Sequence, residues 1–270
     1  MTGGKRPLDD PAGWDAIAPT YDATRSFPGI GEEEVPRRLA STLRSLGVAT
    51  ILEPGVGTGR LAIPLARSGL RVVGIDRSRG MLARLRKKSA EAAMAVVLAD
   101  AARPPFARAF DGLLFSHFLH LVPDLDALAA GLAPVLRPGA HVLCLDGEML
   151  PEPAEERAWE AVYRRLGEPF DPRPRGENTR ERRLFATLLR ALGARPLPAL
   201  SLGTYHREGS LRSHFDEVRR RLWARFWEYD EARMNAVVDA AERDLLVEGA
   251  DLDTPVPEPL GVDLLLGRMA

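Results

Sequence analysis

Short apolar runs alternate with turns and helix-like stretches through the first half of the chain, and this alternation restricts the possible folds more than any other feature. The runs lie at 49–53, 71–76, 95–99, 111–116 and 140–146. Several are apolar almost throughout, which is typical of parallel strands that helices cover on both faces. The sequence therefore predicts an α/β protein built on a doubly wound parallel sheet.

The remainder of the chain has a more helical pattern. We expect a single domain over 1–270, with an N-terminal helical cap at 1–47 and a sheet core at 48–150. An amphipathic helix is predicted at 32–47, where apolar residues recur at helical spacing. Two further strands and the helical segments around them complete the domain: strands at 198–206 and 262–268, helical insertions at 151–197 and 207–258, and helices within them near 153–167, 177–193 and 209–248.

Composition narrows the class of partner. The formal net charge of the 270 residues is −1, so no general field attracts a polyanion, and no nucleic-acid partner is expected. The single cysteine, Cys144, forms neither an internal disulfide nor a Cys-only zinc site. No run reaches the roughly 20 apolar residues that a membrane-spanning helix needs. We expect a cytoplasmic protein, without membrane insertion, that acts on a small molecule.

The first predicted strand runs into a glycine-rich turn at 53–60. Gly55, Gly57 and Gly59 permit positive φ angles and let a ligand approach the backbone closely. A dinucleotide-binding turn would place its third glycine one residue later, where this chain has Arg60. The spacing therefore argues against an NAD-type ligand.

Acidic residues stand at or just after the ends of the first three predicted strands. They are Glu53, Asp76 and Asp100, and the carboxyl ends of parallel strands meet at one edge of a sheet. Such a group of acids would repel a pyrophosphate but would stabilise a ligand with a sulfonium and an ammonium group. The sequence thus predicts S-adenosylmethionine, with Asp76 at the ribose diol, Glu53 near the amino group and Asp100 at the adenine amine.

Asp76 and Asp100 also have purely structural alternatives. Asp76 can cap the helix that follows it, a role for which Ser78 competes, and Asp100 can stabilise a loop. Arg77 can bind a 2′-phosphate, which would favour NADP, or it can stack on an adenine. Its structural alternative is a solvated side chain.

Four motifs appear in order along the chain. They are Glu53-x-Gly55-x-Gly57-x-Gly59, then Asp76-x-Ser78-x-x-Met81-Leu82, then Asp100-Ala101 with Pro105-Phe106, and last Leu136-Arg137-Pro138-Gly139-Ala140. Over roughly 14–148 the chain resembles the class I S-adenosylmethionine-dependent methyltransferases, in particular the small-molecule group of ubiquinone and menaquinone methyltransferases. The resemblance implies a Rossmann-like seven-stranded sheet with an antiparallel last strand and a helical substrate lid, with S-adenosyl-L-methionine as cofactor. It also implies cofactor contacts from Met81, Ala101, Ser116, Tyr21 and Arg25. Tyr21 and Arg25 can instead belong to a plain N-terminal cap on the sheet.

Two histidines, His117 and His120, follow the fourth predicted strand. Their spacing would put them on one side of a helical turn, beside the expected methyl position. Histidine is the usual general base when the methyl acceptor is a hydroxyl group. We therefore predict methyl transfer to a small, partly apolar acceptor. Oxygen is favoured over nitrogen or carbon as the acceptor atom. Either histidine can instead serve only to satisfy backbone groups at the strand end.

An aromatic stripe lies in the second insertion, where Trp223 and Trp227 would share one helix face. It either lines the substrate lid or packs in the core. Two other functions stay open. One is an NAD(P)-dependent oxidoreductase on a similar sheet, although the chain lacks a Tyr-x-x-x-Lys pair. The other is a protein that binds the cofactor without turnover.

Overall fold

The computed structural model divides into two compact units. Unit 1 comprises Met1–Gly147, Gly176–Gly203 and Val262–Ala270, and unit 2 comprises Glu148–Arg175 and Thr204–Gly261. The structure describes residues 11–19, 21–24, 31–89, 92, 94–107, 110–149, 154–170, 179–221, 226 and 229–270. None of the helices in these ranges is both long and apolar enough to cross a membrane.

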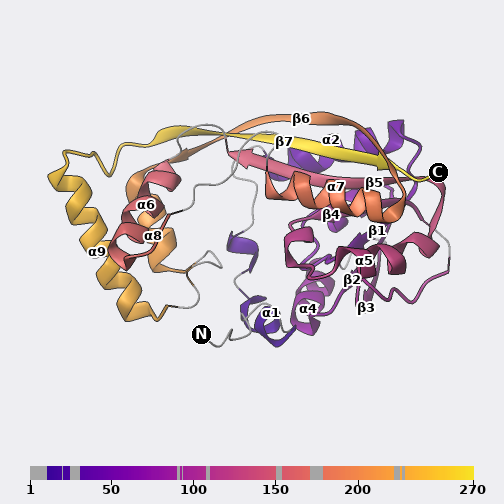
Figure 1. Ribbon diagram of the computed structural model, residues 1–270, viewed down its shortest axis with the longest axis horizontal. Helices are drawn as coiled ribbons and strands as arrows, with labels where there is room; N and C mark the ends of the chain where they lie inside the picture. Colours follow the sequence, from indigo (N-terminus) through magenta and orange to yellow (C-terminus); the bar gives the residue numbers. More distant parts are fainter. Residues whose placement is uncertain are drawn as a thin grey trace. The chain divides into compact units, whose positions relative to one another are not determined.

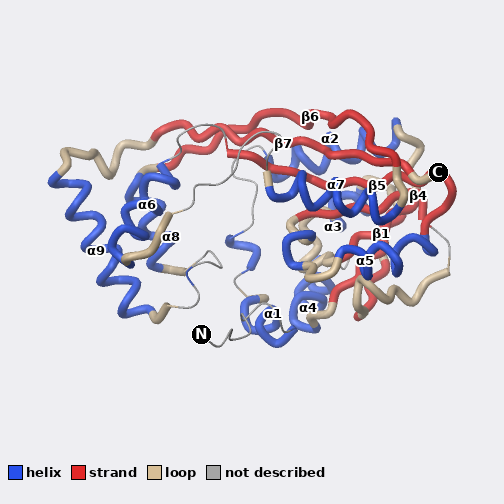
Figure 2. Tube along the Cα trace, in the orientation of Figure 1, coloured by secondary structure: helices blue, strands red, loops and turns tan. Residues whose placement is uncertain are grey.

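A seven-stranded sheet runs through the fold, in the order β3-β2-β1-β4-β5-β7-β6 (Figures 1 and 2). The strands are β1 (Thr50–Pro54), β2 (Arg71–Asp76), β3 (Ala95–Leu98), β4 (Phe110–Ser116), β5 (Leu136–Met149), β6 (Arg195–Gly209) and β7 (Val256–Arg268). Strands β1 to β5 pair in parallel, whereas β7 runs opposite to β5 and β6 (Figure 1). This confirms the predicted sheet and its antiparallel last strand.

The register of the parallel strands aligns their carboxyl ends. Asp76 of β2 pairs with Leu98 of β3, and Ser116 of β4 pairs with Leu145 of β5. Glu53, one residue before the end of β1, pairs with Gly74. The strand-end residues that the sequence singled out therefore lie along one edge of the sheet.

Helices accompany the sheet in unit 1, and α5 packs on α7, α2 on α3, and α1 on α4. They are α1 (Pro11–Ile17), η2 (Tyr21–Thr24), α2 (Gly31–Ser45), α3 (Ala62–Arg67), α4 (Arg79–Lys88), η3 (Leu119–Leu121), α5 (Leu125–Leu132), η4 (Ala133–Val135) and α7 (Arg180–Leu192). The main core joins central strands to α5 and α7 through buried residues such as Leu52, Phe115, Leu132, Val142 and Leu188. Burial of this apolar surface supplies most of the force that holds these layers together.

Unit 2 has a separate apolar core among α6 (Ala154–Leu166), α8 (Leu211–Arg219) and α9 (Glu231–Val247). Trp159, Phe215 and Phe226 are fully buried in it. The sequence suggested helix over 209–248, but α8 ends at Arg219, and Arg221 has a φ of +49°. A left-handed residue cannot continue an α-helix. α9 begins after its N-cap residue Asp230, whose side chain accepts a hydrogen bond from the Arg233 N–H.

The last two strands are longer than the apolar runs that predicted them. β6 spans Arg195–Gly209 rather than 198–206, and β7 starts at Val256 rather than at 262. Prolines occur near the start of both strands, and proline is a poor strand signal because it has no N–H to donate. β6 tolerates its prolines because it is an edge strand of the sheet.

Candidate active site

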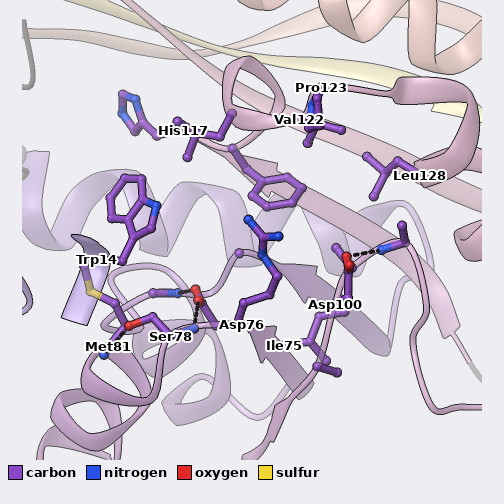
Figure 3. A pocket seen from close by; sticks show the side chains of 18 of the residues that line it. Trp14, Ile75, Asp76, Ser78, Met81, Asp100, His117, Val122, Pro123 and Leu128 are labelled. Atoms are coloured by element: carbon purple, nitrogen blue, oxygen red, sulfur yellow. Dashed lines mark hydrogen bonds between the residues drawn. The ribbon is translucent and has the colours of Figure 1, made fainter. Parts of the chain in front are cut away.

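A cavity of about 250 Å³ lies in unit 1 at the carboxyl edge of the sheet (Figure 3). Its wall combines the glycine turn, the ends of β2 and β4, the residues just after β3, and the start of α5. Most of the predicted site residues line it, namely Tyr21, Gly55, Gly57, Asp76, Arg77, Met81, Asp100, Ala101, Ser116 and His117. The acidic and aromatic residues that were scattered in the sequence thus form one site.

The glycine turn has the backbone geometry that its sequence predicted. Gly55, Gly57 and Gly59 have φ angles of +68°, +54° and +81°. At Gly55 a Cβ atom would come within 2.1 Å of the Phe118 ring. Gly59 has a different environment, because a Cβ there would meet Ile63 and Leu85 at 2.9–3.0 Å. Gly59 therefore serves helix packing and does not line the cavity.

Asp76 anchors the glycine turn to the end of β2. Its Oδ2 accepts a hydrogen bond from the Gly57 N–H at 2.9 Å, and its Oδ1 accepts one from the Ser78 N–H at 2.8 Å. Burial raises the pKa of Asp76, while these backbone donors oppose the increase. Each carboxylate oxygen accepts more than one hydrogen bond, so Asp76 retains acceptor capacity for a ligand in the cavity.

Ser78, not Asp76, caps the helix that follows. The Ser78 hydroxyl accepts a hydrogen bond from the Met81 N–H at 3.0 Å and donates one to Asp15 Oδ1 at 2.5 Å. Asp15 also accepts from the Gly80 N–H at 2.8 Å. These contacts fix α1 against the start of α4, and they place Trp14 in the cavity wall. The Trp14 and Tyr21 rings pack edge to face with centroids 6.1 Å apart.

Glu53 lies beneath the glycine turn and does not line the cavity. It is 4% exposed, and its Oε2 atom has no hydrogen-bond partner. Burial raises the pKa of Glu53 to about 8, although the Arg60 guanidinium acts in the opposite direction. Arg60 also donates a hydrogen bond to the Ser116 hydroxyl at 3.0 Å. Arg60 thereby connects the glycine turn to the end of β4, a role that its position in the sequence did not reveal.

Asp100 and Arg77 lie at the more open part of the site. Both side chains are exposed and both residues line the cavity. Asp100 Oδ1 accepts a hydrogen bond from the Ala102 N–H at 3.0 Å, so the loop-stabilising contact considered for it does occur. That contact leaves the other carboxylate oxygen available.

The two histidines occupy different environments. His117 lies in the bend after β4 with a φ of +50° and lines the cavity. His120 lies in η3, with its Nδ1 atom 3.1 Å from Glu181 Oε1, and is not part of the cavity wall. The expected common side of one helical turn does not form, because His117 precedes the helical turn and its left-handed backbone redirects the side chain.

Apolar residues complete the cavity, and the sequence analysis did not identify them. Besides Trp14 they include Phe118, Leu121, Val122 and Leu128. Figure 3 shows Val122, Pro123 and Leu128 across the view from Trp14 and Met81. Their position directly after a strand end was the available signal, because ligands bind at such ends. Three predicted residues, Arg25, Trp223 and Trp227, lie outside the described ranges.

The segment around this site is similar to known proteins. The methyltransferase domain family matches residues 52–144. A ubiquinone/menaquinone biosynthesis C-methyltransferase from Desulfotalea psychrophila is 33% identical over 137 residues, 49% of this chain and 56% of the relative. A demethylmenaquinone methyltransferase from Streptomyces avermitilis is 33% identical over 141 residues, 52% of this chain and 60% of the relative. The chain thus spans somewhat over half the length of these relatives.

Solved structures with low sequence identity share the fold. The [4+2]-cyclase SpnF has a TM-score of 0.54 at 17% identity, covering 98% of this chain and 97% of its own. The magnesium protoporphyrin IX methyltransferase of Synechocystis PCC 6803 has a TM-score of 0.51 at 12% identity, with full coverage of both chains. Residues 52–144, which carry the glycine turn and most of the cavity wall, thus match the methyltransferase domain family.

Proposed function

We propose that the chain binds S-adenosylmethionine in this cavity and transfers its methyl group to a small, partly apolar acceptor. The observation that carries the proposal is the arrangement of three acids at one sheet edge. Asp76 and Asp100 line the cavity, and the Glu53 carboxyl beneath the glycine turn has an oxygen without a hydrogen-bond partner. A cationic ligand neutralises the negative charge of such acids, whereas a pyrophosphate would add to it.

The residues present fit this cofactor. Asp76 would accept hydrogen bonds from the ribose hydroxyls, and Asp100 would accept from the adenine amine. Glu53 does not line the cavity, so it would act on the ammonium group from beneath the glycine turn and not by direct contact. When bound, the cofactor supplies a methyl group already activated on a sulfonium. The chain's own contribution would be to orient the two reactants and to exclude water. Trp14 and Tyr21 are placed for that role in the cavity wall.

For the acceptor atom we propose oxygen, with His117 as the general base. His117 is exposed at the cavity, and the left-handed backbone at this position holds it just after β4. The neighbouring Phe118, Leu121 and Val122 give the wall an apolar character that suits a partly apolar acceptor. A base near neutral pKa assists the loss of a hydroxyl proton during transfer.

Carbon is the second candidate for the acceptor atom, and the curated relatives favour it. One of them is named a C-methyltransferase of ubiquinone/menaquinone biosynthesis, and another a demethylmenaquinone methyltransferase. By that likeness the acceptor would be a quinone-type ring. Incubation with methyl-labelled S-adenosylmethionine and reduced quinones or simple phenols, followed by NMR of the product, distinguishes an O-methyl from a C-methyl group.

Calorimetric titration tests the cofactor. We expect S-adenosylhomocysteine to bind in the micromolar range and NAD and NADP to give no heat. Asp76→Ala should weaken binding at least tenfold, because it removes charge-assisted hydrogen bonds worth about 1.5–3 kcal/mol each. Asp230→Ala is the matched control, since Asp230 caps α9 in unit 2. It should lower stability without changing affinity. NAD binding with no response to S-adenosylhomocysteine would refute the proposal and favour an oxidoreductase.

The pH dependence of turnover tests the base. If transfer is to oxygen, His117→Ala should reduce turnover about 10²–10⁴-fold and leave cofactor affinity nearly intact. His120→Ala is the control, because His120 contacts Glu181 and does not line the cavity. A flat pH profile and full activity in His117→Ala would instead favour carbon. Cofactor binding with no transfer to any acceptor would favour a binding protein.

A further inference from the structure

A cluster of metal-ligand side chains occurs in unit 2 and is formed by none of the residues of the proposed active site. Glu155 comes from the first turn of α6, and His214 and Glu217 come from α8. One ligand atom from each residue lies within 4.8 Å of the other two. Because α6 and α8 pack against each other, two separate helices contribute to this cluster.

Burial makes the cluster unusual. Glu155 and His214 are each 1% exposed, and Glu217 is partly buried. Carboxylates and imidazoles are rarely placed in protein cores unless they are paired or coordinate a metal. The surrounding residues of the unit 2 core are apolar, including Trp159, Leu211 and Phe215.

The spacing of the ligand atoms also fits a shared ion. His214 Nδ1 lies 3.4 Å from Glu217 Oε2, a long hydrogen bond. Two ligands that each lie about 2.1 Å from a tetrahedral zinc ion are separated by about 3.4 Å. The Glu155 oxygen, within 4.8 Å of both, would complete the set after a displacement of roughly 1.4 Å or less.

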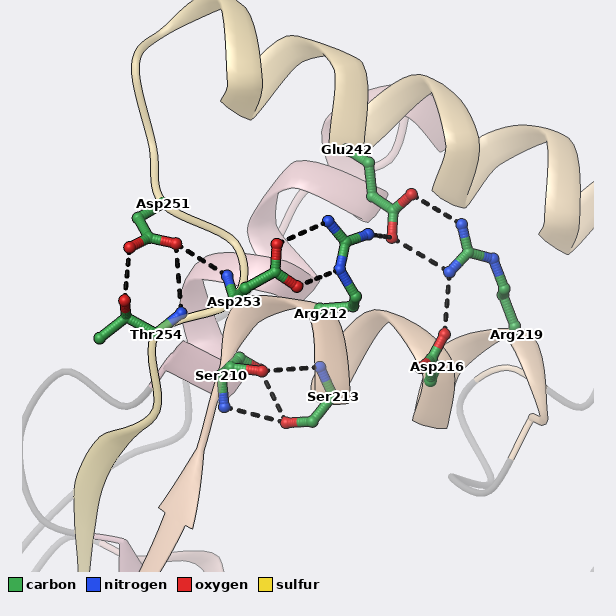
Figure 4. A network of polar contacts seen from close by, with 9 residues as sticks. All are labelled: Ser210, Arg212, Ser213, Asp216, Arg219, Glu242, Asp251, Asp253 and Thr254. Carbon is green, nitrogen blue, oxygen red and sulfur yellow. Dashed lines mark hydrogen bonds and ion pairs between the residues drawn. The ribbon is translucent and has the colours of Figure 1, made fainter.

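The backbone of α8 holds its two ligands in place. His214 and Glu217 are spaced i, i+3 and therefore lie on the same side of the helix. Ser210 and Ser213 form a capping box at the start of α8. Further around α8, Arg212 and Arg219 bind acidic residues of α9 and of the 251–254 loop (Figure 4). These contacts fix α8 independently of the cluster.

We propose that Glu155, His214 and Glu217 bind a divalent transition-metal ion, for which zinc is the best match. An imidazole nitrogen favours zinc over magnesium or calcium, and two carboxylates leave a fourth position for water. The ion would link α6 to α8 and so stabilise unit 2. Three acid or imidazole ligands from two packed helices are a common design for metals in helical bundles.

The test uses the full chain with zinc chloride as the probe. We expect one equivalent of zinc to remain after dialysis and to be detected by elemental analysis, together with a higher midpoint of thermal unfolding. His214→Ala and Glu217→Gln should each weaken zinc binding at least tenfold in calorimetric titration. The Glu217 variant keeps the test valid if loss of the buried imidazole prevents folding, because Glu217 is only partly buried.

His120→Ala provides the matched control, because His120 also pairs with a glutamate, at 3.1 Å from Glu181 Oε1. It should retain the zinc equivalent. The proposal is overturned if the wild-type chain retains no zinc, or if zinc binding persists unchanged in the folded Glu217→Gln variant. A response to magnesium or calcium that equals the response to zinc would also contradict it.

Discussion

Burial of the Glu53 carboxyl raises its pKa to about 8, so at neutral pH this group is mostly protonated unless a cation lies beside it. The folded-state pKa is above the unfolded value of about 4.5. A group of this kind stabilises the fold fully below its unfolded pKa, and this contribution is lost as the pH rises through the folded pKa. Between about pH 4.5 and 8, Glu53 is ionised in the unfolded chain but mostly protonated in the folded chain. The free energy of unfolding therefore falls as the pH rises through this range.

This linkage predicts the pH dependence of stability. The free energy of unfolding of the ligand-free chain should fall as pH rises from 5 to 9, and Glu53→Gln should reduce that slope because glutamine does not ionise. Urea denaturation at several pH values measures it. Glu34→Gln is a control on the surface, where Arg37 and Arg38 lower the pKa of Glu34, so the slope over this range should be unchanged. An unaltered slope in Glu53→Gln would contradict the prediction.

Individual residues also show which features of the site the sequence alone can predict. Asp76 and Asp100 could be placed at the cavity because they stand at or just after strand ends, and strand ends are readable from apolar runs. The direction of the His120 side chain could not be predicted from the sequence, because its partner Glu181 is 61 residues further along the chain. The burial of Glu53 likewise depends on neighbours that only the fold brings together.

At the scale of elements, the glycine turn gives a comparison between two positions. Both Gly55 and Gly57 have positive φ, but a Cβ at Gly55 would clash with Phe118, while a Cβ at Gly57 would meet only the Gly55 carbonyl oxygen at 3.9 Å. Gly57→Ala should therefore lower the free energy of unfolding by about 1–2 kcal/mol from backbone strain alone. Gly55→Ala should lower it by about 2–5 kcal/mol because overpacking adds to the strain.

Urea denaturation of the two variants side by side checks this order. Gly55→Ala should also weaken binding of S-adenosylhomocysteine, because it displaces Phe118 from the cavity wall. Equal losses of stability in both variants would show that backbone strain, not the Phe118 contact, determines the cost at this turn.

The elements differ in how well the sequence predicted them. The first five strands were found because their apolar runs are continuous and turns separate them. β6 and β7 were too short in the prediction because prolines interrupt their pattern. The end of α8 was missed because Arg221 adopts a positive φ without being glycine, and arginine carries no local signal for that conformation.

The division into two units is a property of the whole molecule. Each unit is assembled from segments that are distant in sequence, so no local sequence pattern predicts the division into units. A polar network holds unit 2 together, in which the Glu242 carboxylate accepts hydrogen bonds from Arg219 at 2.7 and 3.0 Å and lies 3.6 Å from Arg212 (Figure 4). The Glu242 side chain is 13% exposed, so solvent screens it only in part.

This network predicts that Glu242→Gln lowers the free energy of unfolding by about 1–3 kcal/mol, because two guanidinium groups lose a common anion. Affinity for S-adenosylhomocysteine should not change, since every residue of the cavity wall belongs to unit 1. Chemical denaturation and calorimetry on the same preparation measure both quantities. A loss of affinity without a loss of stability would contradict this separation.

The contact between Asp15 and the Ser78 cap has a practical consequence for anyone who produces this protein. It makes α1 part of the cavity wall, since Trp14 lines the cavity. Trimming the first helix to obtain a shorter recombinant protein would remove one wall of the pocket and an acceptor for the Ser78 hydroxyl and the Gly80 amide. A purification tag is therefore better attached at the C-terminus, and ligand-binding assays should use chains that keep the N-terminal helix.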